Sequence, residues 1–237
     1  MAVIGERTGH VFCRPAALGG SGDSSPATAI GTVAALKAVC AALFGSPDLA
    51  GHSFAILGLG RVGAHVAGLL TDAGAKLTVS DIDESRRALA PAATWTSPAD
   101  CLSAEVDVLV PAALGGVLTP ATVPSLRCRA VAGPANNQLD APPTADLLHE
   151  RGILWAPDAV VSAGGIIHAT AVELRHEPER QARHRVEAIG DTLAALLRSA
   201  SVAGIPPAEA AARALQDVND QRAVRSAAGA GEMPPLP

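Results

Sequence analysis

The stretch SFAILGLGRVGAHVAGLLTDAGAKLTVSDID, residues 53–83, decides the fold of this chain. It opens with an apolar run of strand length at residues 54–57, and it continues into a segment whose apolar side chains recur on one face of a helix. Gly74 suits the C-cap of that helix, and a second strand follows at residues 77–79. The stretch therefore predicts a strand–helix–strand unit.

Three glycines follow the first strand in a G-x-G-x-x-G spacing, at Gly58, Gly60 and Gly63. The first permits a tight turn, the second lets a pyrophosphate approach the backbone, and the third lets the helix pack closely on the sheet. The unpaired N–H groups and the positive dipole at the helix N-terminus favour the same phosphates. An acid at the end of the second strand, Asp81, completes the spacing, and the pattern predicts a dinucleotide-binding site.

Asp81 decides which dinucleotide we expect the site to prefer. Its carboxylate would accept hydrogen bonds from the adenosine ribose hydroxyls and would repel a 2′-phosphate. Arg86 and Arg87 could offset that charge, but we interpret them as solvated arginines on the polar face of the next helix. The expected cofactor is therefore NAD(H), with NADP(H) less favoured.

The composition excludes several classes of function. The net charge is −5 and no basic stripe is present, which argues against a nucleic-acid partner. We find no apolar run of about 18 residues that would span a membrane. The N-terminus has no basic region followed by an apolar core, so we do not expect secretion. The four cysteines are isolated and lack metal-ligand spacing, so we expect no metal site and free thiols in a reducing, cytoplasmic setting.

Strand and helix patterns alternate along the rest of the chain. Short helices are predicted at residues 84–89 and 145–151, and further strands at residues 93–96, 106–110, 129–132 and 153–155. Each strand ends in a loop rich in Gly, Pro or Asn, and such loops line the ligand crevice at the carboxyl edge of a parallel sheet. A helical region begins again at Ser162.

The pattern predicts an α/β fold, a Rossmann-type, doubly wound, mostly parallel sheet with additional C-terminal helices. One NAD-binding domain would cover residues 1–220, with flanking helices at 26–44 and 178–218. Within the second region, we expect one long helix from 178 to about 203 and a last helix to about Val218. Residues 221–237 are predicted to form a disordered tail.

Several strand-end segments resemble those of a known family. They are GGSGDSSPATAIG (19–31), GLGRVG (58–63), DVLVPAALGG (107–116), VAGPANNQL (131–139) and GILWAPDAVVSAGGII (152–167). In this order they resemble the glutamate, leucine, phenylalanine and valine dehydrogenases, over roughly residues 10–220. The resemblance implies the cofactor-binding domain of these amino-acid dehydrogenases, with their N-terminal catalytic domain missing.

The resemblance also implies roles for residues around the crevice. The nicotinamide carboxamide would bind Thr28, and the nicotinamide ribose would bind Asn136, unless that residue only shapes a turn. The pyrophosphate would contact Gly60, Arg61 and Val62. The wall of the crevice would be formed by Ala112, Ala113 and Leu114.

The reaction of the family is reversible oxidative deamination of an L-amino acid. One departure from the family changes the reaction that we expect for this chain. The family's N-terminal domain supplies two lysines and a catalytic aspartate, whereas this chain has only Lys37 and Lys76, and neither is expected to substitute. We therefore expect an NAD(H)-dependent oxidoreductase that reduces a preformed imine, for which a cyclic imine is well suited. The alternatives are a residual amino-acid dehydrogenase and a non-catalytic or split subunit that needs a partner chain. We also expect a homodimer that uses helices of residues 178–218.

His168, Ser162 and Asp23 are the candidate catalytic residues. His168 lies where the family usually has Asn or Gln, and its imidazole could donate a proton as hydride arrives at the adjacent carbon. The alternative is a half-buried histidine bonded to a backbone carbonyl. Ser162 replaces an asparagine that contacts substrate in the family, but it could simply cap the helix that it begins. Asp23 could act as an acid or base, or cap the helix at residues 26–44.

Overall fold

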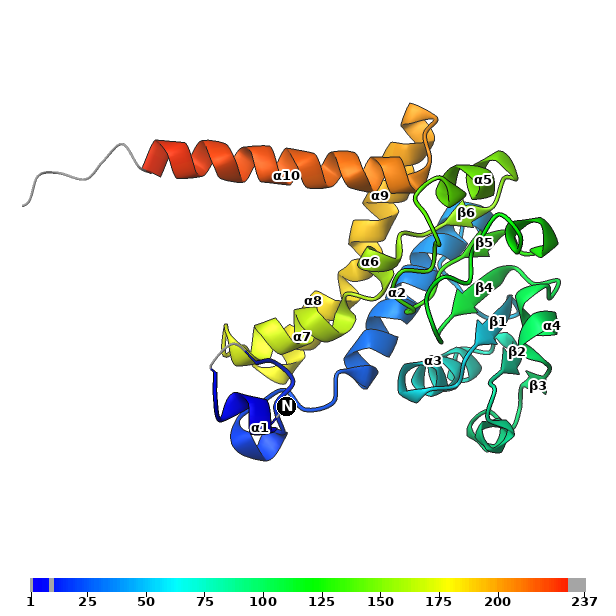
Figure 1. Cartoon of the computed structure of the whole chain (residues 1–237), viewed down its shortest axis with the longest axis horizontal. Helices are drawn as coiled ribbons and strands as arrows, with labels where there is room; N and C mark the ends of the chain where they lie inside the picture. The colour runs from blue at the N-terminus through cyan, green and yellow to red at the C-terminus, as the bar shows by residue number, and fades with distance from the viewer. Residues whose placement is uncertain (1, 9–10, 230–237) are drawn as a thin grey trace, which may run out of the picture.

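The computed structural model describes residues 2–8 and 11–229, and a parallel sheet forms its centre (Figure 1). The sheet has six strands in the order β3-β2-β1-β4-β5-β6. In chain order these are β1 (Ser53–Leu57), β2 (Lys76–Ser80), β3 (Thr94–Trp95), β4 (Val108–Pro111), β5 (Ala130–Val131) and β6 (Leu154–Trp155). All neighbours pair in parallel, and the strand order reverses between β1 and β4. This arrangement confirms the predicted Rossmann-type fold and places the ligand crevice at the carboxyl ends of these two strands.

Continuous apolar runs explain why β1 and β4 lie at the centre. Every residue of β4 is buried, as are all residues of β1 after Ser53. Parallel strands that are covered on both faces need apolar side chains in both directions, and SFAIL and VLVP provide them. The register pairs Phe54 with Leu77 and with Val108, which aligns the strand ends on one edge.

Helices cover both faces of the sheet. One core joins it to α2 (Ser25–Phe44), α3 (Arg61–Asp72), α6 (Asp158–Val161), α8 (Glu179–Glu187) and α9 (Ile189–Ala203). The core on the other face includes buried residues of α4 (Pro98–Leu102) and α5 (Thr144–Glu150). The 3₁₀ helix η2 (Glu84–Leu89) follows β2, and α7 (Gly164–Glu173) packs across the N-terminal part of α2. Short turns of helix also occur at α1 (Ala2–Gly5), η1 (Ala16–Leu18) and η3 (Val123–Ser125).

α2 is the apolar helix at the centre of the helical layer. Its length and hydropathy are those of a membrane span, which differs from the expectation that no segment reaches this length. However, 56% of the qualifying window is buried inside the protein, because α2 packs against α3, α7 and α9. Glycines allow the close approach to α7: a Cβ on Gly164 would lie 2.4 Å from the carbonyl oxygen of Ala27.

The C-terminal region differs from the prediction in where its helices begin and end. The helix predicted from 178 to 203 is two helices, which meet at Ala188 with ψ near −6°. The last helix, α10 (Pro207–Gly229), extends past the predicted end at Val218, so the predicted tail is wrong for residues 221–229. Those residues, QRAVRSAAG, contain mostly good helix formers, which explains the longer helix. The rest of the predicted tail, 230–237, lies outside the described residues.

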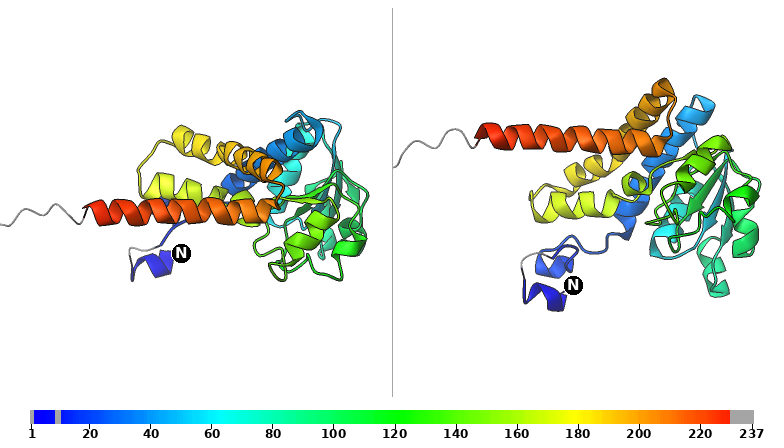
Figure 2. Two further views of the ribbon diagram at one scale, coloured as in Figure 1. Left: turned by 90° about the horizontal axis from the view of Figure 1, so that it is seen from above. Right: turned by 45° about the horizontal axis from the view of Figure 1, so that its top comes forward.

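α10 extends away from the sheet and from the other helices (Figures 1 and 2). Ala210 is buried near its start, whereas residues 212–221 are all exposed. Two of these are large apolar residues, with Leu215 62% and Val218 45% exposed. Residues 212–221 of this helix are therefore not packed against the rest of the described chain.

Candidate cofactor site

The turn between β1 and α3 has the geometry that its glycines require. Gly58 has φ of 106°, and a Cβ there would lie 2.7 Å from the Cβ of Ala113. A Cβ on Gly63 would lie 2.1 Å from the carbonyl oxygen of Gly58, so α3 could not pack against the turn. The Cβ of a residue at Gly60 would instead enter free space, with only the Arg86 guanidinium nearby at 3.7 Å. The backbone is therefore open to a ligand at the second glycine, which fits a dinucleotide pyrophosphate.

The N-terminus of α3 adds positive potential at the same place. Gly60 is the N-cap and has no side chain to cap the helix. Arg61 begins the helix, its side chain is 81% exposed, and a nitrogen of its guanidinium lies 3.6 Å from an oxygen of Asp23. This contact brings the start of α2 next to the start of α3, so both segments border the crevice.

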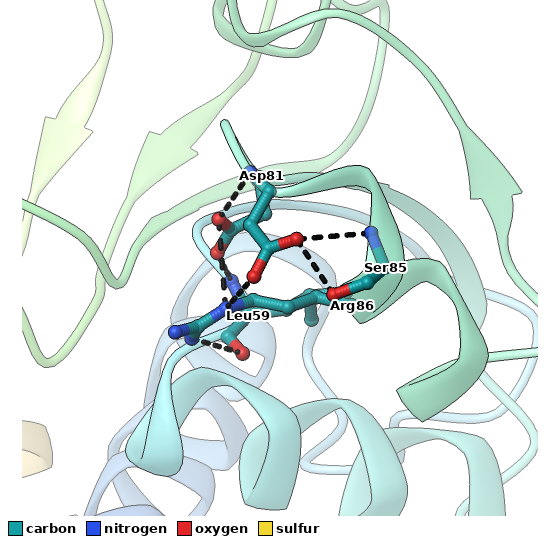
Figure 3. Close-up of polar contacts among 5 residues, drawn as sticks. Leu59, Asp81, Ser85 and Arg86 are labelled. Carbon is teal, nitrogen blue, oxygen red and sulfur yellow. Dashed lines mark hydrogen bonds and ion pairs between the residues drawn. The ribbon is translucent and has the colours of Figure 1, made fainter.

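Asp81 lies at the end of β2 and faces the glycine turn (Figure 3). Its Oδ2 accepts a hydrogen bond of 2.7 Å from the N–H of Leu59, and its Oδ1 accepts one of 3.0 Å from the N–H of Asp83. The carboxylate thus holds the two loops together. Each oxygen also keeps acceptor capacity for a ribose hydroxyl.

Arg86 corrects the expectation of a solvated side chain. It is half-buried, and its Nη1 donates a hydrogen bond of 3.0 Å to the carbonyl oxygen of Leu59. Its Nε lies 3.5 Å from Oδ2 of Asp83 and 3.8 Å from Oδ1 of Asp81. The sequence pattern missed this contact because Arg86 lies 27 residues from Leu59. Arg87, the next residue, is exposed as expected.

Four of the other predicted cofactor residues also follow the carboxyl ends of strands, whereas Thr28 lies on α2. Ala112, Ala113 and Leu114 follow β4, and Leu114 is 82% exposed. Asn136 follows β5 and is exposed. Thr28 lies in the second turn of α2, where its hydroxyl donates to the carbonyl oxygen of Ser24 at 3.0 Å. A Cβ on the neighbouring Gly165 would lie 2.7 Å from that hydroxyl, so α7 closes one side of Thr28.

A cavity of about 250 Å³ brings two of the three catalytic candidates together. It lies between the start of α2, α7 and α8, and both Asp23 and His168 line it. His168 is buried, and its Nε2 lies 3.0 Å from the Glu179 carboxylate, so the expected alternative of a backbone carbonyl partner is wrong. Since Asp23 also contacts Arg61, this cavity adjoins the glycine turn.

Asp23 and Ser162 differ from each other in their local roles. Asp23 accepts hydrogen bonds from the O–H and N–H of Ser25 in the first turn of α2, and these bonds lower the pKa of its carboxyl. Asp23 thus satisfies the N–H of Ser25 at the start of α2, although Ser24 is the N-cap of that helix. Ser162 does not cap the next helix: it ends α6, and Ala163 is the N-cap of α7 without a side-chain bond.

Glu173 is a buried tether between α7 and the segment before α2. Its Oε1 accepts hydrogen bonds from the N–H of Cys13 and from the N–H and O–H of Ser21. Burial raises the pKa of this carboxyl, but the Ser21 and Cys13 hydrogen bonds and the nearby Arg14 outweigh burial and lower it. The carboxylate therefore fastens the segment before α2 to α7 and is not presented to a ligand.

Neither lysine of this chain lies at the crevice. Lys76 begins β2 at the opposite, amino edge of the sheet. Lys37 is exposed on α2, where it lines a groove of about 640 Å³ together with Arg183, Glu187 and Asp191. Among the described residues, no group of three His, Cys, Asp or Glu side chains could hold a metal ion.

Comparisons with known proteins agree with this geometry. A sequence profile of the glutamate/leucine/phenylalanine/valine dehydrogenases matches residues 19–85 and 79–182. The phenylalanine dehydrogenase of Lysinibacillus sphaericus is 40% identical over 220 residues, which are 90% of this chain and 58% of that protein. The leucine dehydrogenase of Geobacillus stearothermophilus is 36% identical over 230 residues, which are 95% of this chain and 62% of that protein. The chain therefore spans about 60% of the length of these relatives.

A solved structure shows the same similarity in three dimensions. The L-tryptophan dehydrogenase of Nostoc punctiforme matches with a TM-score of 0.77 at 35% sequence identity. The match covers 81% of this chain and 59% of that structure. Both the sequence and the fold are thus similar to part of an amino-acid dehydrogenase.

Proposed function

This chain belongs to the glutamate/leucine/phenylalanine/valine dehydrogenase family, and we propose that it is an NAD(H)-dependent oxidoreductase that acts on a C–N bond. One observation carries the cofactor part of the proposal: the free space at Gly60 lies between the start of α3 and the Asp81 carboxylate. A pyrophosphate at Gly60 would meet the N-terminus of α3, and the adenosine ribose would meet Asp81. The bound nicotinamide would supply the hydride.

The substrate class that we propose is a preformed imine, which becomes an amine when its carbon receives hydride and its nitrogen receives a proton. Lys37 and Lys76 lie away from the crevice, so the described residues offer no lysine there for adding or removing water and ammonia. Hydride transfer to an existing imine depends mainly on positioning and on charge complementarity. A cyclic imine fits this requirement because it does not need to be formed in the site.

The cavity beside Asp23 is the place that we propose for the proton-handling groups. Nε2 of His168 lies within hydrogen-bond distance of the Glu179 carboxylate, and a partner of this kind orients the imidazole ring. His168→Gln should lower kcat for imine reduction by about 100-fold or more and flatten its pH profile, while NADH still binds. A variant that keeps the wild-type pH profile would leave His168 with a structural role only.

The second candidate is a dinucleotide-binding subunit that works with residues from another segment or chain. The absence of lysine from the described crevice favours it as well, because such residues could come from a partner. Purified protein tested for NADH oxidation against cyclic imines, amino acids and 2-oxo acids with ammonia separates the two candidates. Oxidation of NADH with an imine supports the first, whereas NADH binding without turnover supports the second. Turnover with 2-oxo acids and ammonia would instead indicate an amino-acid dehydrogenase.

We also propose that the chain forms a homodimer through its C-terminal helices. α10 exposes Leu215 and Val218 three residues apart, on one side of a helix in which residues 212–221 are all exposed. A dimer would bury this side against a second copy. Light scattering should give twice the monomer mass at micromolar concentration, and Leu215→Glu should shift it towards monomer.

A further inference from the structure

Arg86 is the cation of the adenosine end of the crevice, and its position is fixed by contacts on three sides. Its Nη1 donates to the Leu59 carbonyl oxygen, and its Nε faces carboxylate oxygens of Asp81 and Asp83 (Figure 3). The same guanidinium comes within 3.7 Å of where a Cβ on Gly60 would be. It therefore reaches the space that the glycine turn leaves open.

We propose that Arg86 is a second specificity-determining residue, which offsets the charge of Asp81 and allows NADP(H) to bind as a secondary cofactor. This inference rests on the proposed function, because it assumes that a dinucleotide occupies the crevice. Asp81 favours a ribose with free hydroxyls, and Arg86 sets how strongly a 2′-phosphate on that ribose is rejected.

Charge and donor geometry both support this role. Asp81 and Asp83 alone would place two negative charges next to the ribose, and the guanidinium reduces the sum to one. A guanidinium has five N–H donors in a planar fork that matches phosphate oxygens, and the Leu59 carbonyl uses one nitrogen. The side chain is also 40% exposed, so its remaining donors can reach a ligand.

The neighbouring residue provides a matched control. Arg87 lies on the same 3₁₀ helix and carries the same charge, but it is exposed. In the described part of the chain it makes no hydrogen bond or ion pair. Removal of either arginine therefore changes the long-range electrostatic potential by a nearly equal amount. Of the two, only Arg86 contacts the glycine turn.

Fluorescence titration with NADH and with NADPH tests the inference on the full chain. Arg86→Ala should weaken NADPH binding by about tenfold, or about 1.4 kcal/mol, and change NADH binding by less than about threefold. Arg87→Ala should change either affinity by less than about threefold. Arg86→Lys keeps the charge without the fork and should give an intermediate NADPH affinity.

Four results would overturn the inference. Equal weakening of both cofactors in Arg86→Ala, with a lower melting temperature, would make Arg86 a structural tether between the two loops. Equal effects of Arg86→Ala and Arg87→Ala would assign the preference to overall charge. If the wild type binds neither dinucleotide, the proposed function fails and this inference fails with it. If Arg86→Ala does not fold, unchanged NADPH affinity in Arg86→Lys would likewise contradict the role of the fork.

Discussion

At the amino edge of the sheet the polar side chains satisfy one another, whereas at the carboxyl edge they surround an open space. Asp107 lies just before β4, accepts hydrogen bonds from the N–H and O–H of Ser53, and is 3.5 Å from His52. The His52 ring stacks on Phe44 with centroids 4.2 Å apart, and the Arg129 guanidinium lies 4.5 Å from the centroid of Phe44. The amino edge is thus closed by its own side chains.

The carboxyl edge contains the same kinds of residue with a different result. Asp81 also accepts two hydrogen bonds, here both from backbone N–H groups, and Arg86 lies beside acidic groups. The difference is the glycine turn, which leaves backbone and helix N-terminus uncovered at Gly60. Polar composition therefore does not distinguish a site from a structural cluster. What distinguishes the two is the open space beside a glycine, which has no side chain to fill it.

The largest effect on NADH affinity is expected for a substitution of Gly63, which tests directly whether the glycine turn makes the carboxyl edge a binding site. A Cβ there would lie 2.1 Å from the Gly58 carbonyl oxygen, so Gly63→Ala should displace the turn and weaken NADH binding by about 100-fold or more. Gly68→Ala in the same helix is the control, because no atom lies within 4 Å of its Cβ position. It should bind NADH normally and raise the free energy of unfolding by about 0.5–1 kcal/mol. Normal NADH binding by Gly63→Ala would contradict the steric role of this glycine.

The next effect concerns stability at the amino edge. Asp107→Ala removes the acceptor for the Ser53 N–H and should lower the free energy of unfolding by about 2 kcal/mol. NADH affinity should not change, since Asp107 lies at the opposite edge. Urea unfolding and NADH titration measure the two quantities. A loss of NADH affinity without a loss of stability would mean that the two edges are not independent.

The pH dependence of the free energy of unfolding tests the role of Asp107 at the amino edge separately. Burial raises the pKa of Asp107, but the hydrogen bonds from Ser53 and the nearby His52 outweigh burial and hold it below its ordinary value of 3.8. A depressed pKa in the folded state stabilises the protein above the unfolded pKa, and this contribution is lost as pH falls through the folded pKa. The wild type should therefore lose more stability than Asp107→Ala below about pH 4. Parallel curves of unfolding free energy against pH would contradict the assignment.

A smaller effect is expected at the ribose-binding acid. The wild type should prefer NADH over NADPH by at least about tenfold, which requires about 1.4 kcal/mol of discrimination. Asp81→Ser should narrow or reverse this preference because the carboxylate no longer repels the 2′-phosphate. Far-ultraviolet circular dichroism serves as the control for an intact fold. Tighter binding of NADPH by the wild type would assign recognition to Arg86 and not to Asp81.

The smallest effect is expected for the ion pair at the mouth of the crevice. Arg61 and Asp23 are 3.6 Å apart, with side chains 81% and 46% exposed. Solvent screens such a pair, so Arg61→Ala should change the free energy of unfolding by less than about 0.5 kcal/mol. NADH affinity should fall by less than about threefold if the helix backbone supplies the main phosphate contacts. A much larger loss would show that the Arg61 side chain itself binds the pyrophosphate.

The sequence by itself determined the sheet and the glycine turn, because both depend on local patterns. Apolar runs of strand length, the spacing of Gly58, Gly60 and Gly63, and the acid at Asp81 are all visible without coordinates. Loops after strands could be assigned to one edge, because all strands of a parallel sheet end there. For this reason Gly58, Asp81 and Asn136, predicted around the cofactor, lie in loops that follow the carboxyl ends of strands.

Only the tertiary structure decided which side chains meet across long separations in the chain. Arg86 reaches Leu59, His168 meets Glu179 on the next helix, and Glu173 holds Cys13 and Ser21 from the start of the chain. Periodicity gives the face on which a residue lies but not the partner that a long side chain finds there. The same limit applies to α10, where helix propensity continues through residues 212–221 although all of them are exposed.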